Sequence, residues 1–267
     1  MPSIFRDHLL QGRVAFLTGG GSGIGRRIAE RFAEHGSKVV LVGRKPEKLE
    51  ETAAAIRAAG GIAEIEPLDV RNFEALEAAL QRTRDRFGEI DILLCAAAGN
   101  FPAPVAGMSA NGFKAVIDID LLGTFNTCRA AYPHLRKPGA SILSISANHA
   151  VTPFAYQAHV CAAKAGVELL TKTLALEWGA QGIRANCITP GATADTEGMS
   201  RLAPTDEARR ACERGIPLRR LGTKDELADL ALFLSSDAAG YITGAVYPCD
   251  GGTSLSRSDF SAAFTSR

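Results

Sequence analysis

The sequence predicts a doubly wound α/β fold, in which helices cover both faces of a parallel β-sheet. Short, almost continuously apolar runs alternate with longer amphipathic stretches along the chain. Runs of this kind are typical of strands that are buried on both faces. Their alternation with helices indicates β-α-β units, whose right-handed crossovers place the loop after each strand along one edge of the sheet. We expect ligands to bind at that edge.

The predicted strands are the short apolar runs. They span 14–17, 38–42, 62–67, 90–95, 141–145 and 183–188, and a final strand spans 245–248. The predicted helices are the amphipathic stretches, which span 23–35, 46–59, 72–87, 112–135 and 156–178. No repeat or Pro/Gly-rich linker divides the chain. We therefore expect a single domain over residues 1–267, with a flexible tail over about residues 255–267.

Size and charge exclude several classes of protein. The chain has 267 residues, of which 46% are hydrophobic, and a formal net charge of +1. This composition indicates a globular domain and gives no electrostatic reason to expect a nucleic-acid or membrane partner. The longest apolar stretch, residues 92–98, is far shorter than the ~20 residues that span a bilayer.

The cysteines and the two ends of the chain bear on the compartment. The six cysteines are scattered without a Cys-x-x-Cys pair, so we expect neither a disulfide framework nor a metal site. The first twelve residues do not resemble a signal peptide, and residues 265–267 do not match a Ser-Lys-Leu peroxisomal address. These observations predict a cytoplasmic protein.

A glycine-rich turn follows the first strand and leads directly into a helix. The segment runs Thr-Gly-Gly-Gly-Ser-Gly-Ile-Gly over residues 18–25. Glycines let backbone N–H groups approach a pyrophosphate, which also sits at the positive end of the helix dipole. The residues that we expect to bind a dinucleotide here are Gly19, Gly21, Ser22, Gly23, Ile24 and Gly25.

The end of the second strand indicates which dinucleotide binds. An NAD-binding protein typically places a carboxylate there for the ribose 2′-hydroxyl, but no acidic residue lies between the end of this strand and Glu47. Arg44 instead suits the 2′-phosphate of NADP, so we expect NADP(H). Further cofactor contacts are expected after later strands, from Asp69, Val70, Ala97, Pro190, Gly191 and Thr193.

These motifs occur in the order and at the spacing of a known family. The glycine turn, Asp69, the Ala-Ala-Gly stretch ending at Gly99, Lys164, Pro190-Gly191 and Asp250-Gly251-Gly252 resemble the short-chain dehydrogenase/reductase family over residues 12–253. The resemblance implies a Rossmann-like sheet of about seven strands and, very often, a homotetramer.

The catalytic positions depart from the usual pattern of that family, which has an Asn, a Ser and a Tyr-x-x-x-Lys pair. Lys164 is present, but Val160 stands at the tyrosine position. Ala147 stands at the serine position and Asp120 at the asparagine position. The usual tyrosine transfers the proton of an alcohol or carbonyl, so ordinary alcohol oxidation lacks its acid–base group here.

The changed set resembles one branch of the family, the peroxisomal-type 2,4-dienoyl-CoA reductases. The similar segments are residues 97–101, 118–120, 157–159 ahead of Lys164, and 196–198. The likeness implies catalysis by Asp120 and Lys164 with an ordered water. The residues expected to contact an acyl-CoA thioester are Asn100, Phe101, Gln157, His159 and Thr196.

The expected reaction belongs to unsaturated fatty acid metabolism and needs no tyrosine. Hydride from NADPH adds to the δ carbon of the dienoyl thioester, and negative charge moves to the thioester oxygen, where hydrogen-bond donors stabilise it. A water held by Asp120 and Lys164 then protonates the α carbon to give a 3-enoyl-CoA.

Two other functions remain open. A carbonyl or alcohol oxidoreductase would use Tyr156 as a displaced acid, but on a continuous helix Tyr156 lies roughly 12 Å from Lys164. A non-catalytic NADP-binding protein is permitted by the missing tyrosine and serine, although Lys164 argues against it. The arginines at 209, 210, 214, 219 and 220 are expected to form mostly a solvated face, and His149 is expected to be structural.

Overall fold

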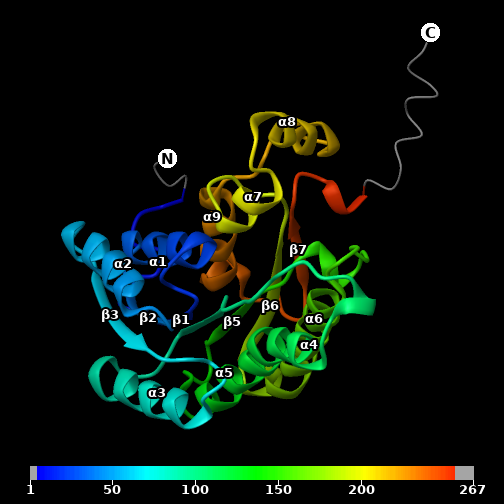
Figure 1. Cartoon of the computed structure of the whole chain (residues 1–267). Coiled ribbons are helices and arrows are strands. Elements are labelled where there is room, and N and C mark those ends of the chain that lie inside the picture. Colours follow the sequence, from blue (N-terminus) through cyan, green and yellow to red (C-terminus); the bar gives the residue numbers. More distant parts are fainter. Residues whose placement is uncertain (1–4, 256–267) are drawn as a thin grey trace.

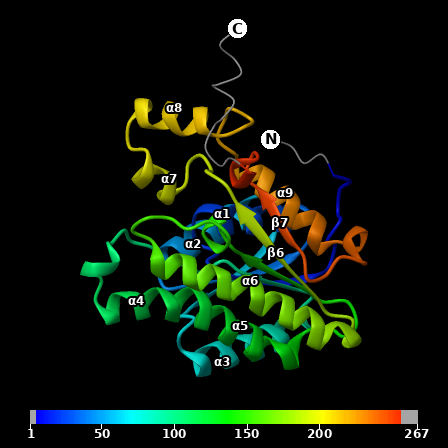
Figure 2. The same ribbon diagram turned by 90° about the vertical axis from the view of Figure 1, so that its right-hand side faces the viewer.

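The computed structural model describes residues 5–255, apart from the side chains of residues 201 and 202. Seven parallel strands form one sheet in the order β3-β2-β1-β4-β5-β6-β7. Helices cover both faces of this sheet (Figure 1; Figure 2). The predicted doubly wound, Rossmann-like fold is therefore confirmed.

The strands lie within two residues of the predicted ranges. They are β1 (Val14–Thr18), β2 (Lys38–Gly43), β3 (Ile62–Pro67), β4 (Ile92–Cys95), β5 (Ser141–Ile145), β6 (Arg184–Pro190) and β7 (Val246–Cys249). The helices are α1 (Gly23–Glu34), α2 (Pro46–Ala58), α3 (Phe73–Phe87), α4 (Ala110–Val116), α5 (Gly123–Ala131), α6 (Ala158–Trp178), α7 (Glu197–Leu202), α8 (Asp206–Gly215) and α9 (Lys224–Ser235).

Some helices differ from the prediction. The single helix expected over 112–135 is divided into α4 and α5 by a π-helical segment, Ile117–Leu122. The helix expected from 156 begins at Ala158, because Tyr156 has a φ of 64° and lies outside the helical region. No helix was predicted where α7, α8 and α9 form. The tail predicted over 255–267 lies, from residue 256, outside the described residues.

The segment after β6 carries the predicted arginine face. Helix α8 has no buried residue, and it lies with α7 apart from the helices that cover the sheet (Figure 2). The five arginines between residues 209 and 220 are all exposed, as expected. Among residues 5–255, no helix combines the length and apolarity needed to cross a membrane.

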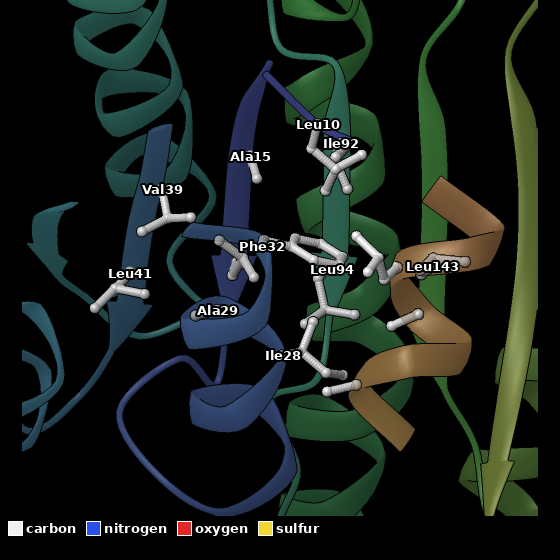
Figure 3. Packing of buried hydrophobic residues seen from close by; sticks show 14 of the residues in the cluster. Leu10, Ala15, Ile28, Ala29, Phe32, Val39, Leu41, Ile92, Leu94 and Leu143 are labelled. Atoms are coloured by element: carbon white, nitrogen blue, oxygen red, sulfur yellow. The ribbon is translucent and has the colours of Figure 1, made fainter. Parts of the chain in front are cut away.

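The two faces of the sheet bury separate apolar clusters. Ala15 and Leu17 of β1 face a cluster shared with α1, α2 and α9, whereas Val14 and Phe16 face a cluster shared with α3, α5 and α6. Figure 3 shows Phe32 of α1 lying against the strand side chains of the first cluster. This alternation along a fully buried strand is what a parallel sheet requires.

The strand order reverses between β1 and β4. The chain winds outward through β2 and β3 and then returns to the other side of β1 to form β4. The loops after β1 and β4 therefore leave the sheet in opposite directions, which opens a crevice at the carboxyl ends of the strands. The predicted glycine turn and residues 97–101 both lie at this crevice.

A buried arginine joins the first and last helices. The Arg31 side chain of α1 is 1% exposed, and its guanidinium lies 2.8 Å from Asp225 Oδ1, 3.1 Å from Asp229 Oδ1 and 3.2 Å from Glu34 Oε2. A buried guanidinium is tolerated only when it is paired in this way. Arg31 therefore fixes α9 against the last turn of α1.

We expect Arg31→Ala to lower the free energy of unfolding by about 3 kcal/mol, because it leaves the carboxylates of α9 without this partner. Urea unfolding measures the change. Arg26→Ala on the same helix is the control, since its pairs with Glu30 and Glu51 are more exposed and should contribute much less. Equal losses for the two variants would contradict this account of Arg31.

Candidate active site

The glycine turn leaves no room for side chains at two positions. A Cβ on Gly19 would lie 2.5 Å from the carbonyl oxygen of Ala96, and a Cβ on Gly25 would lie 2.4 Å from the carbonyl oxygen of Gly19. Gly19 also has a φ of +72°, which favours glycine. The turn thus packs backbone against backbone at the start of α1, and this fits the close approach of a pyrophosphate.

Thr18 ties this turn to the neighbouring strand. Its hydroxyl donates to the carbonyl of Leu94 at 3.2 Å and accepts from the backbone N–H of Ala96 at 3.2 Å. Ala97 follows at the mouth of the crevice and is half-buried. The ends of β1 and β4 are therefore held together where a dinucleotide would cross between them.

The cofactor contacts predicted at Arg44, Asp69 and Val70 lie on neighbouring loops. Arg44 is exposed directly after β2. The Asp69 carboxylate is engaged by Arg71, whose guanidinium donates two hydrogen bonds that lower the pKa of that carboxyl, and Arg44 acts in the same direction. Val70 is buried, and its carbonyl accepts from the Asn126 side chain. The roles of these residues toward a cofactor remain predictions.

The centre of the site is a buried ion pair between the two predicted catalytic residues. Lys164 Nζ lies 3.2 Å from Asp120 Oδ2, and the two side chains are 8% and 1% exposed. The ammonium also donates to the carbonyl of Ile145 at 3.0 Å. The other carboxylate oxygen, Oδ1, accepts from the backbone N–H of Gly99 at 2.7 Å. The loops after β4 and β5 are thus joined to α6 through this pair.

A π-helical segment places Asp120 in that position. Asp120 lies inside Ile117–Leu122, between α4 and α5. The wider turn leaves its backbone carbonyl to accept from the Thr124 hydroxyl at 2.7 Å. π-helical turns are rare and often mark functional sites, because they turn a side chain out of the regular helical register.

The position that carries the tyrosine in the usual pattern is apolar. Val160 is 4% exposed and packs with Val116 and Ala163 in a small cluster beside the ion pair. Tyr156 does not replace the missing acid here, because it precedes α6 and its side chain is 59% exposed. Its backbone carbonyl instead accepts from Ala103, which joins the loops after β4 and β5.

Two of the predicted substrate residues are in contact. The rings of Phe101 and His159 meet edge to face, with centroids 4.5 Å apart. His159 is fully buried, and among the described residues neither of its ring nitrogens has a hydrogen-bond partner. Asn100 is exposed beside Phe101, and Gln157 is buried at the start of α6. A buried imidazole without partners fits a site where a ligand oxygen binds.

The loop after β6 is held by its own hydroxyl groups. Pro190 ends β6, and a Cβ on Gly191 would lie 2.5 Å from the backbone of Asp250. The Thr193 hydroxyl donates to the carbonyl of Gly191 at 3.0 Å. Thr196 caps α7, since its hydroxyl accepts from the N–H of Met199 and donates to the carbonyl of Thr193. The hydroxyl of Thr196 therefore has a structural role, and its contact with substrate stays a prediction.

The sequence did not point to Asn148, which lies directly after the position of the missing serine. It is 7% exposed, its amide nitrogen donates to Asp250 at 3.3 Å, and its amide oxygen has no partner among the described residues. Next to it, the His149 ring stacks on Phe154, and burial lowers the pKa of this imidazole. No sequence motif marks Asn148, because its partner Asp250 lies 102 residues further along the chain.

Comparison with known proteins places these features in context. The model of a family described as enoyl-(acyl carrier protein) reductase matches residues 19–254. The chain is 44% identical over 252 residues to the peroxisomal 2,4-dienoyl-CoA reductase of Saccharomyces cerevisiae, covering 93% of this chain and 86% of that protein. Identity to the rat peroxisomal 2,4-dienoyl-CoA reductase is also 44%, with 94% and 86% covered. A probable 2,4-dienoyl-CoA reductase of Bacillus subtilis is 41% identical, with 91% and 97% covered.

Solved structures share the fold closely. A citronellol catabolism dehydrogenase of Pseudomonas aeruginosa matches with a TM-score of 0.85 and 36% identity, over 95% of this chain and 100% of that chain. A gluconate 5-dehydrogenase of Burkholderia cenocepacia, solved with NADP and tartrate, matches with a TM-score of 0.87 and 30% identity, over 94% and 99%.

The prediction of a cytoplasmic location was wrong. The names of the yeast and rat relatives place those proteins in peroxisomes. The prediction rested on composition and on residues 265–267, which lie outside the described residues. A cellular address is read from a few residues by a receptor and leaves no mark on composition or fold.

We expect Gly25→Ala to weaken dinucleotide binding by about tenfold or more, because the new methyl group must displace the Gly19 backbone from the turn. Isothermal titration calorimetry with NADPH measures the loss. Gly198→Ala on α7, where a Cβ meets nothing within 4 Å, is the control. Undiminished affinity in Gly25→Ala would show that the turn does not hold the dinucleotide.

Proposed function

The chain belongs to the short-chain dehydrogenase/reductase family, and we propose that it is an NADPH-dependent 2,4-dienoyl-CoA reductase of unsaturated fatty acid metabolism. The observation that carries this proposal is the buried Asp120–Lys164 pair beside an apolar tyrosine position. Such a site lacks the acid that an alcohol dehydrogenase needs, but its carboxylate and ammonium can hold and polarise a water. The names of the yeast and rat relatives give 2,4-dienoyl-CoA reductase activity with a (3E)-enoyl-CoA product, whereas the name of the Bacillus subtilis relative gives a (2E)-enoyl-CoA product.

The family binds NAD(P), and we propose NADP(H) for this chain. The glycine turn would hold the pyrophosphate, Arg44 the 2′-phosphate, and Lys164 the nicotinamide ribose. Pro190, Gly191 and Thr193 would line the nicotinamide. When bound, NADPH supplies the hydride that adds to the δ carbon of the dienoyl thioester. The tight backbone packing at Gly19 and Gly25 supports this placement.

The protein then delivers a proton to the α carbon of the substrate. Asp120 and Lys164 hold a water between an acceptor and a donor, and this water protonates the α carbon of the dienolate. The Lys164 ammonium stabilises the negative charge left on the water oxygen. No hydroxyl group forms on the substrate, so the reaction proceeds without a tyrosine. The product is a 3-enoyl-CoA. The names of the yeast and rat relatives also give a (3E)-enoyl-CoA as their product.

His159 is the proposed donor to the thioester oxygen. Its ring nitrogens have no partner among the described residues. A hydrogen bond to the dienolate oxygen would therefore offset the free-energy cost of burying an unpaired imidazole N–H. The Phe101 ring packs edge to face against this imidazole, and Asn100 and Gln157 line the same region. Tyr156 is not a second candidate acid, because its exposed ring precedes α6.

We further propose one domain over residues 1–267 that assembles as a homotetramer. All seven strands belong to one sheet. On the outer faces of α5 and α6, Phe125, Leu169 and Leu176 are 41%, 66% and 85% exposed. Apolar side chains gathered on neighbouring helices commonly mark an interface between subunits.

We expect Asp120→Asn and Lys164→Met each to lower kcat for NADPH oxidation with 2,4-hexadienoyl-CoA by about 100-fold or more, because either change removes a charge that positions the water. Loss of NADPH absorbance measures the rate. Tyr156→Phe is the control and should retain the activity of the wild type. If Tyr156→Phe is the most damaging of the three, the proposed mechanism is wrong.

We expect Arg44→Asp to weaken NADPH binding by about tenfold or more while leaving NADH binding largely intact, since only NADPH carries the 2′-phosphate. Calorimetric titration with each dinucleotide gives the two constants. Lys48→Asp, at an exposed position in the first turn of α2, controls for a general change of charge. An equal loss of both dinucleotides would remove the basis for naming NADP.

A further inference from the structure

Helix α6 presents a polar stripe to the sheet, where apolar side chains would be expected. Lys164, Glu168 and Thr171 follow one another at helical spacing on one face. All three residues are buried. Lys164 belongs to the catalytic pair, and the Thr171 hydroxyl donates to the Ser144 hydroxyl at 3.1 Å. Glu168 has no role in the mechanism described so far.

The Glu168 carboxylate binds the ends of two strands. Its Oε1 accepts from the Ser146 hydroxyl at 2.7 Å and from the Thr189 hydroxyl at 3.4 Å. Ser146 and Thr189 are each 3% exposed. In the part of the chain that the structure describes, no lysine or arginine nitrogen forms an ion pair with this carboxylate. Glu168 is therefore a buried carboxyl group held by hydroxyl groups.

The two strand ends that Glu168 holds lead directly into the active site. Ser146 follows Ile145, whose carbonyl accepts from Lys164, and the backbone N–H of Ser146 donates to Ile188 at 2.8 Å. Thr189 precedes Pro190 and Gly191, which turn toward the proposed nicotinamide site. Lys164 and Glu168, one turn apart on α6, thus contact neighbouring residues. The Lys164 ammonium donates to the Ile145 carbonyl, and the Glu168 carboxylate accepts from the Ser146 hydroxyl.

Stability alone does not account for this arrangement. Burying a carboxylate costs free energy, and an apolar side chain of similar size often serves the fold as well or better. On the basis of the proposed function, we propose that Glu168 is a positioning residue: it anchors Ser146 and Thr189 so that the Ile145 carbonyl keeps the Lys164 ammonium beside Asp120.

The test compares Glu168→Leu with Glu168→Gln. We expect Glu168→Leu to lower kcat for the dienoyl thioester by about tenfold or more, since small displacements of catalytic groups are costly. KM and the melting temperature should stay near those of the wild type, and NADPH should still bind by calorimetry. Glu168→Gln keeps an oxygen acceptor for the two hydroxyls and should restore most of kcat. Glu77→Leu, on an exposed face of α3, is the matched control.

The outcomes are distinguishable. A wild-type protein that binds NADPH but does not reduce dienoyl thioesters would overturn the proposed function itself. With an active wild type, an unchanged kcat in Glu168→Leu would overturn the role of Glu168. So would a loss of kcat that only parallels a loss of melting temperature in both variants. If Glu168→Leu does not fold, Ser146→Ala decides: a lower kcat at normal stability supports the proposal, and a normal kcat overturns it.

Discussion

The buried ion pair between Asp120 and Lys164 is the contact through which the active site is assembled. It joins the π-helical segment to α6, and each partner also bonds to the backbone of a strand-end loop. Two opposite charges in a low-dielectric interior must satisfy each other, so neither side chain can move without leaving the other unpaired. The positions of the loops after β4 and β5 follow from that requirement.

The same pair explains how the fold supports chemistry without its usual acid. An alcohol dehydrogenase must move a proton on oxygen, which requires a hydroxyl such as tyrosine close to the substrate. Val160 packs into an apolar cluster at that position and can provide no proton. Reduction of a conjugated thioester needs a proton at carbon, which a water between a carboxylate and an ammonium can provide. The loss of the tyrosine at Val160, the retained Lys164 and the carboxylate of Asp120 at the asparagine position therefore point to one reaction class.

The parts predictable from the sequence are those set by local patterns. The apolar runs predicted all seven strands, and the glycine spacing predicted the turn in which Gly19 and Gly25 contact backbone. The motif positions brought Asp120 and Lys164 together correctly. Helices α7 to α9 were missed: α8, for example, buries no residue, so no apolar face marks it. The π-helical segment was missed because no local pattern distinguishes it from a regular helix, and the tertiary hydrogen bond from Gly99 to Asp120 within it is not visible in the sequence.

Other features depend on contacts between distant parts of the chain. Tyr156 has a left-handed backbone just before α6, and its carbonyl accepts from the backbone N–H of Ala103, a contact that the local sequence does not reveal. Asn148 and Glu168 acquire their significance only from partners such as Asp250 and Ser146.

The most direct test of the central claim is the fate of deuterium in the reduction of 2,4-hexadienoyl-CoA. The reaction is run once in D₂O with NADPH, and once in H₂O with NADPH deuterated at the transferred position. NMR of the product locates the label. The account predicts a 3-enoyl-CoA with solvent deuterium at the α carbon and cofactor deuterium at the δ carbon. Cofactor deuterium at the carbonyl carbon, or no label transfer at all, would contradict it.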